Sequence, residues 1–194
     1  RLILSTTAAS LPLQWAYSKP KLPLIGMLWH ASSEQDEGSY YVEFMAGLRD
    51  HGYVEGETIH VEHRYAGEKY DRFPEQAAEL INLGVDVLVA SIRPAALAAK
   101  KLTSSIPIVF CTTADPIESG LVSTLNRPGG NITGLSTMSI ELGAKRLEMT
   151  KEALPGLQKI ALLVNSTDPE LALRFIKDNE EAAASLRIEL LPIQ

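Results

Sequence analysis

Several features are scarce or missing in this sequence of 194 residues, and each absence excludes a class of protein. A single cysteine, Cys111, rules out an intrachain disulfide. It lies within an apolar run, where burial predicts an inert thiol. The formal net charge of −6 argues against a nucleic-acid-binding surface, because phosphate recognition needs basic side chains. No stretch approaches the roughly 20 consecutive apolar residues of a membrane span. The remaining composition is typical of a globular protein.

The common enzyme motifs are also missing. There is no phosphate-binding GxxxxGK[ST] loop and no GxSxG nucleophile elbow. Gly129 and Gly130 form a turn before the strand expected over 132–135, and Gly129-Gly130-x-x-x-Gly134 lacks the GxGxxG spacing of a dinucleotide fingerprint. His60 and Glu62 share one face of a predicted strand, with no further ligand nearby, which favours a solvated strand edge over a metal site. The sequence therefore predicts no catalytic residue, no metal site and no cofactor.

Residues 1–18 differ from the rest of the chain. Arg1 is followed by LILSTTAASLPLQWAYS, which carries no charge and ends on the small-x-small step Ala16-Tyr17-Ser18. A positive start, an apolar stretch and such a step are typical of a secretory signal peptide. We expect residues 1–18 to be a signal-peptide remnant, the alternative being a flexible or packing N-terminal arm. No membrane span is expected in the mature chain.

Apolar strands then alternate with amphipathic helices. This alternation predicts an α/β lobe over residues 19–137, with a mostly parallel sheet, helices on both faces and right-handed crossovers. The expected strands are residues 24–29, 58–65, 85–90, 106–111 and 132–135. The expected helices lie near residues 41–51, 71–84 and 95–103, with a short one from 115 to about 125.

The same rhythm restarts after Thr137. A helix from Ser139 to Leu154, a strand over 159–165, a helix from Asp168 to Ser185 and a strand over 187–193 are expected. These elements are too few for a sheet covered on both faces. They either extend the first sheet or form an incomplete second α/β lobe over residues 138–194, and we favour the second lobe.

Polar side chains follow each predicted parallel strand. Because the carboxyl ends of parallel strands meet at one edge of the sheet, these residues predict a ligand crevice. Hydroxyl groups and free helix N–H groups suit a carboxylate. Asp115 is suited to an ammonium group or, equally, to capping the next turn, and Trp29 to stacking. The candidate ligand-binding residues of the first lobe are Trp29, His30, Ser32, Ser91, Arg93, Thr112, Thr113, Asp115, Ser136 and Thr137.

Two long segments carry a family resemblance, namely LRDHGYVEGETIHVEHRYAGEKYDRFPEQAAEL and PIVFCTTADPIESGLVSTLNRPGGNITGLS. Over residues 22–170 the sequence resembles the substrate-binding proteins of ABC transporters, of the tryptophan/tyrosine-type uncharacterised group. The resemblance implies a type I periplasmic-binding fold whose two lobes close on a ligand. Asn165 of the second lobe would then face the strand ends of the first.

The resemblance also implies a function. It describes a non-catalytic, periplasmic or otherwise extracytoplasmic component of an ABC importer, which binds an amino acid or similar small molecule and delivers it to a membrane permease. The alternative is the ligand-sensing core of a regulator or receptor with the same fold. The sequence departs from the family at Ser91-Ile92-Arg93-Pro94, where a Gly-Thr-Pro-like step is common, and Arg93 is suited to pairing with a ligand carboxylate.

Overall fold

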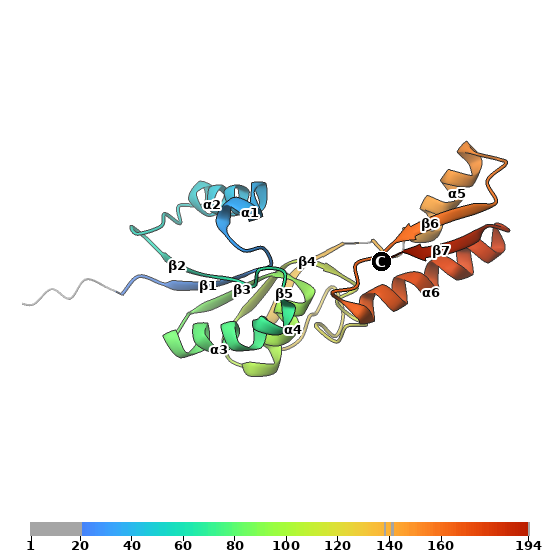
Figure 1. The fold of residues 1–194 in the computed structure, drawn as a ribbon. Coiled ribbons are helices and arrows are strands. Elements are labelled where there is room, and N and C mark those ends of the chain that lie inside the picture. Colours follow the sequence, from blue (N-terminus) through green and yellow to red (C-terminus); the bar gives the residue numbers. More distant parts are fainter. Residues whose placement is uncertain (1–20, 138, 141, 194) are drawn as a thin grey trace, which may run out of the picture.

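The computed structural model describes residues 21–137, 139–140 and 142–193. The predicted signal-peptide remnant, residues 1–18, lies outside these described residues. The described chain forms a five-stranded sheet with its helices, followed by a smaller two-stranded unit with its own helices (Figure 1). We call these the first unit, residues 24–137, and the second unit, residues 143–193.

The first unit is built on an entirely parallel sheet. Its strand order is β2-β1-β3-β4-β5, so the chain reverses its direction of progress across the sheet between β1 and β3. In open α/β sheets of this order, ligands bind at that switch point, outside the carboxyl ends of the strands. The strands are β1 (Leu24–Trp29), β2 (His60–Tyr65), β3 (Val87–Ile92), β4 (Ile108–Ala114) and β5 (Ile132–Thr137).

Helices cover both faces of this sheet, as predicted. The short α1 (Glu34–Glu37) and α2 (Ser39–Asp50) lie on one side, and α3 (Phe73–Leu83) and α4 (Arg93–Leu102) lie on the other (Figure 1). A 3-10 turn, η1 (Tyr70–Arg72), leads into α3.

Alternating side chains along β1 divide the core between the two faces. Leu28 belongs to the larger cluster, which packs against α3 and α4 and includes Phe73 and Leu88. Met27 and Trp29 point to the opposite face and form a smaller cluster with Val89. This division follows from the two-residue period of a strand. It explains why β1 has an unbroken apolar sequence, since a strand covered on both faces needs apolar residues at every position.

The second unit repeats the strand and helix pattern on a smaller scale. Its two strands are parallel and pair from Lys159↔Glu189 to Leu163↔Ile193. Leu147, Ala183 and Ile188 form its buried core. The elements are α5 (Gly143–Ala153), β6 (Lys159–Leu163), α6 (Pro169–Ser185) and β7 (Glu189–Ile193).

Four local predictions are corrected by the structure. The helix expected from Asp115 to about Leu125 is a series of turns, because Asp115 and Gly120 have positive φ angles of 49° and 70°. The helix expected from Ser139 begins only at Gly143. Strands β4 and β5 run past their expected ends to Ala114 and Thr137, because the parallel ladder continues through these polar residues. The polar stretch expected after β1 contains the short helix α1.

Candidate functional site

A cavity of about 250 Å³ lies at the switch point of the five-stranded sheet. We call it the switch-point cavity. Its walls come from the ends of β1, β3 and β4 and from the two helices that follow β1. The lining residues are Met27, Trp29, His30, Glu37, Tyr40, Phe44, Ser91, Ile92, Cys111 and Thr112.

Three polar side chains in this cavity carry buried atoms that have no hydrogen-bond partner among the described residues. They are Nδ1 of His30, Oε2 of Glu37 and Oγ of Ser91. Glu37 is only 3% exposed, and its Oε1 accepts a hydrogen bond of 2.8 Å from the backbone N–H of Ala31. His30 Nδ1 lies 3.0 Å from the same Oε1, outside hydrogen-bond geometry. Buried polar groups in native proteins are almost always satisfied, so this cluster points to a missing partner.

The position of Glu37 follows from the local sequence. Ser33 caps α1 by accepting a hydrogen bond of 3.2 Å from the backbone N–H of Asp36. The helix then ends after one turn at Gly38, whose φ of 58° suits glycine. This turn directs Glu37 inward, while Glu34 and Asp36 stay exposed. The Ser-x-x-Asp pattern is a capping signal, so α1 could have been predicted from sequence.

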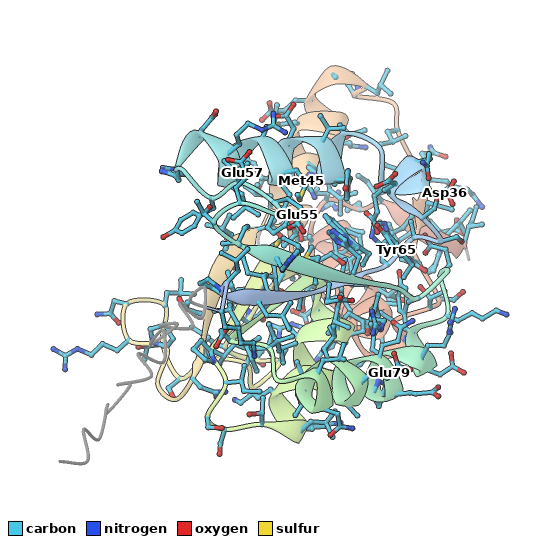
Figure 2. The ribbon with its side chains drawn as sticks, turned by 90° about the vertical axis from the view of Figure 1, so that its left-hand side faces the viewer. Asp36, Met45, Glu55, Glu57, Tyr65 and Glu79 are labelled. Carbon is cyan, nitrogen blue, oxygen red and sulfur yellow. The ribbon has the colours of Figure 1, made fainter. Side chains whose placement is uncertain are left out.

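An aromatic layer forms the other wall of the cavity. Trp29 is 2% exposed and packs edge-to-face on Phe44, with 5.8 Å between ring centroids. Its indole N–H donates a hydrogen bond of 3.0 Å to Nδ1 of His63. Tyr65, labelled in Figure 2, belongs to the same cluster and stacks on His63 with 6.1 Å between ring centroids, and burial raises its pKa to about 12. Trp29 is thus held by its neighbours, and Tyr40, at 69% exposure, is the most accessible aromatic side chain of the cavity.

His63 gives the first testable prediction, a loss of stability at low pH. Burial lowers its pKa below the ordinary value of about 6.5, although the negative charges of Glu55, Glu34 and Glu62 act in the opposite direction. The unfolded chain therefore binds the proton first as the pH falls. The stabilisation from neutral His63 is present above about pH 6.5 and is lost as the pH falls through the lowered folded-state pKa.

Chemical denaturation between pH 8 and pH 5 measures this effect. In the His63→Gln variant we expect a flatter dependence of unfolding free energy on pH, because position 63 no longer carries an imidazole that titrates. His51→Gln is the matched control, since His51 is exposed at the end of α2. Equal pH dependence of the His63→Gln variant and the unmodified protein would contradict the assignment.

A second cavity, of about 360 Å³, lies between the first and second units. We call it the inter-unit cleft. Ile92 and Thr112 line both this cleft and the switch-point cavity. The second unit contributes Asn165 and Phe175, among others. Thr112 therefore lies at the junction between the switch-point cavity and the inter-unit cleft.

Ion pairs beside this cleft hold two of the predicted ligand-binding residues. Arg93, at 7% exposure, donates a hydrogen bond of 2.9 Å from Nε to Oδ2 of Asp168, and its Nη1 lies 3.3 Å from Glu170. Burial opposes the charge of Arg93, but the bonds to these two carboxylates outweigh it and raise its pKa. Asp115 pairs with Arg174 of α6. Both residues therefore link the two units in this structure.

Seven of the eleven predicted residues line one or both cavities. Trp29, His30, Ser91 and Thr112 line the switch-point cavity, and Arg93, Thr112, Thr137 and Asn165 line the inter-unit cleft. Ser32, Thr113, Asp115 and Ser136 lie outside both cavities. Three cavity residues that the sequence did not indicate are Glu37, Tyr40 and Phe44.

Three further observations concern the reactivity of Cys111, metal binding and membrane insertion. Burial raises the pKa of the Cys111 thiol, which favours its unreactive form. Within residues 21–137, 139–140 and 142–193, no group of three or more His, Cys, Asp or Glu side chains is arranged to hold a metal ion. None of the helices that the structure describes is long and apolar enough to span a bilayer.

The parallel sheet, its strand order and the cavities at its carboxyl edge define a type I periplasmic-binding α/β protein, as the sequence predicted. The chain belongs to the ABC transporter substrate-binding protein family, whose model matches residues 36–192. A curated relative is the tyrosine-binding protein of Clostridioides difficile (strain R20291). It is 33% identical over 126 residues, which cover 64% of this chain and 36% of the relative.

Solved structures support the same fold. A conserved domain protein from Vibrio cholerae O1 biovar El Tor has a TM-score of 0.76 and 27% identity, over 89% of this chain and 57% of that one. The ABC domain from Streptococcus pneumonia, solved in complex with L-Trp, has a TM-score of 0.73 and 22% identity, over the same shares of the two chains. This chain thus spans 36% of the tyrosine-binding protein and 57% of each structure.

Proposed function

We propose that this chain is the solute-binding part of an extracytoplasmic component of an ABC importer. It binds an amino acid or similar small molecule and passes it to a membrane permease without chemical change. The proposal treats residues 19–137 and 138–194 as two lobes that close on the ligand by a hinge motion.

The switch-point cavity is the observation that carries this proposal. It lies where open α/β sheets bind ligands, and it combines an aromatic wall with buried polar atoms that have no partner. The tyrosine-binding relative makes an aromatic amino acid the first ligand to test. Ligand in this cavity would extend past Thr112 toward the inter-unit cleft and Asn165, so both lobes would contact it.

A thermal-shift screen of the full-length protein tests the proposal. Protein from the extracytoplasmic fraction is melted with each of the 20 amino acids and with sugars and small carboxylates as controls. A ligand present at about 100 times its Kd adds about 2.7 kcal/mol to the free energy of unfolding, because it binds only the folded state. We expect L-tyrosine or a related amino acid to raise Tm. A complete lack of shifts, or recovery of the protein only from the cytoplasm, would contradict the proposal.

A further inference from the structure

We propose that Glu37 makes the site selective for ligands that carry an amino group, by receiving the ammonium group at its Oε2 atom. This inference rests on the proposed function and names the chemistry that the site selects. The predicted ammonium acceptor, Asp115, is paired with Arg174, whereas Glu37 lines the cavity and its Oε2 has no partner among the described residues.

The burial of Glu37 is the first step of the argument. At 3% exposure, a carboxylate loses most of its hydration, and leaving one oxygen without a partner is costly. Its Oε1 is already used by the backbone N–H of Ala31. Oε2 has no partner among the described residues. Glu37 lines the same cavity as Ser91, which is 9% exposed and whose Oγ also lacks a partner in the described part of the chain. Two such buried polar groups on residues that line one cavity indicate a binding site for a polar group of a ligand.

The charge of the cavity decides which ligand group fits. None of the described residues that line it is Lys or Arg, and the imidazole of His30 lies 3.0 Å from Oε1 of Glu37, which leaves Oε2 without a partner. A ligand carboxylate would be repelled there, whereas an ammonium group supplies three donors and a compensating charge. Ser91 Oγ would accept a second of these hydrogen bonds.

The aromatic residues of the cavity provide a contact surface for the side chain of the ligand. Tyr40 and Phe44 line the same cavity as the polar cluster. Their ring faces attract a cation and pack against an apolar or aromatic side chain. The volume of about 250 Å³ is below the range of about 300–1,000 Å³ typical of drug-sized ligands, which favours a molecule of amino-acid size.

Calorimetric titration of the full-length protein tests the inference with three probes. They are L-tyrosine, its decarboxylated analogue tyramine and its deaminated analogue 3-(4-hydroxyphenyl)propanoate. We expect tyramine to compete with L-tyrosine and the deaminated analogue to bind much more weakly. Glu37→Gln should weaken L-tyrosine binding by about ten- to hundred-fold, the range for a hydrogen bond to a charged group. The same variant should not weaken binding of the deaminated analogue, which has no ammonium group for Glu37 to receive.

Two further variants keep the test specific. Glu34→Gln makes the same charge change on the exposed side of α1 and should bind L-tyrosine as the unmodified protein does. Ser91→Ala removes a hydroxyl that bonds to nothing in the described part of the chain, so it should weaken L-tyrosine binding without lowering Tm. If Glu37→Gln lowers Tm too far for its binding to be measured, the affinity of Ser91→Ala for L-tyrosine still tests the inference.

The outcomes separate this inference from the proposed function. If the unmodified protein binds amino acids but Glu37→Gln and Ser91→Ala bind them equally well, the inference is wrong and the proposed function stands. The same holds if the deaminated analogue or another amine-free solute binds as tightly as L-tyrosine. If no probe in the thermal screen binds at all, the proposed function fails and the inference fails with it.

Discussion

Replacing Arg93 with methionine is expected to lower the free energy of unfolding by about 3–5 kcal/mol, the range for removing one partner of a buried ion pair. Arg93 is 7% exposed, and its guanidinium holds both carboxylate oxygens of Asp168, whose side chain is 12% exposed. Without Arg93, the one hydrogen bond that the described residues still give that carboxylate is its capping bond of 3.3 Å from the backbone N–H of Leu171. Glu170 is 80% exposed and adds little.

The pair also joins two helix starts. Arg93 is the first residue of α4, where a positive charge alone is unfavourable to the helix dipole. Asp168 is the N-cap of α6, and its carboxylate lies beside both helix N-termini. One residue of the pair comes from each unit. Loss of Arg93 should therefore weaken the contact between the two units as well as lower the stability of the protein.

Urea denaturation in a double-mutant cycle measures the coupling. Arg93→Met should cost much less in an Asp168→Asn background, since no buried charge is then left unpaired. Arg64→Met is the control, because Arg64 forms a partly exposed surface pair with Glu79 at 2.7 Å that is worth about 0–1 kcal/mol. If Arg93→Met costs no more than Arg64→Met, the two units do not depend on this pair.

The fold was predictable from sequence because its signals are local. The apolar run over residues 24–29 indicated β1 with its observed bounds, and Asp168-Pro169 indicated the start of α6. Parallel topology then follows from the alternation of strands and helices. The same logic brought Trp29, Ser91 and Thr112 together, since all three lie at the carboxyl ends of neighbouring strands and line one cavity.

The pairing of charges was not predictable, because it depends on residues distant in the chain. Arg93 and Asp115 looked free for a ligand, but their partners lie on α6 or at its start, with Asp168 75 residues beyond Arg93. The inward direction of Glu37 was missed for a different reason. It depends on a helix of four residues, which is too short for any hydrophobic period to reveal.

Gly134→Ala is expected to be the most damaging single-methyl substitution in the sheet. A Cβ atom on Gly134 would lie 2.1 Å from the carbonyl oxygen of Phe110 and 2.5 Å from its ring. Phe110 is 2% exposed and lies in the main core, so neither its backbone nor its side chain has room to withdraw. Overpacking a core costs about 1–3 kcal/mol, occasionally more, and we expect a value at or above the top of that range.

The close approach of Gly134 to Phe110 results from the register between β4 and β5. Phe110 pairs with Gly134 and Thr113 with Ser136, so β4 carries one residue more than β5 over this step. Such a bulge bends the strand and brings backbones together, which is where a strand needs glycine. Thr112 lies within the bulge and lines both cavities.

Gly134→Ala should therefore reduce ligand binding as well as stability. Relieving the clash must move β4 away from β5, and the displaced segment carries Thr112, at the junction between the switch-point cavity and the inter-unit cleft. Gly47→Ala is the matched control, because Gly47 lies in α2 and a methyl group added there would meet no atom within 4 Å. That control should stabilise the protein by about 0.5–1 kcal/mol through helix propensity. Urea denaturation and calorimetry of both variants with L-tyrosine measure the two effects. Unchanged stability and affinity in Gly134→Ala would show that the bulge does not set the shape of the site.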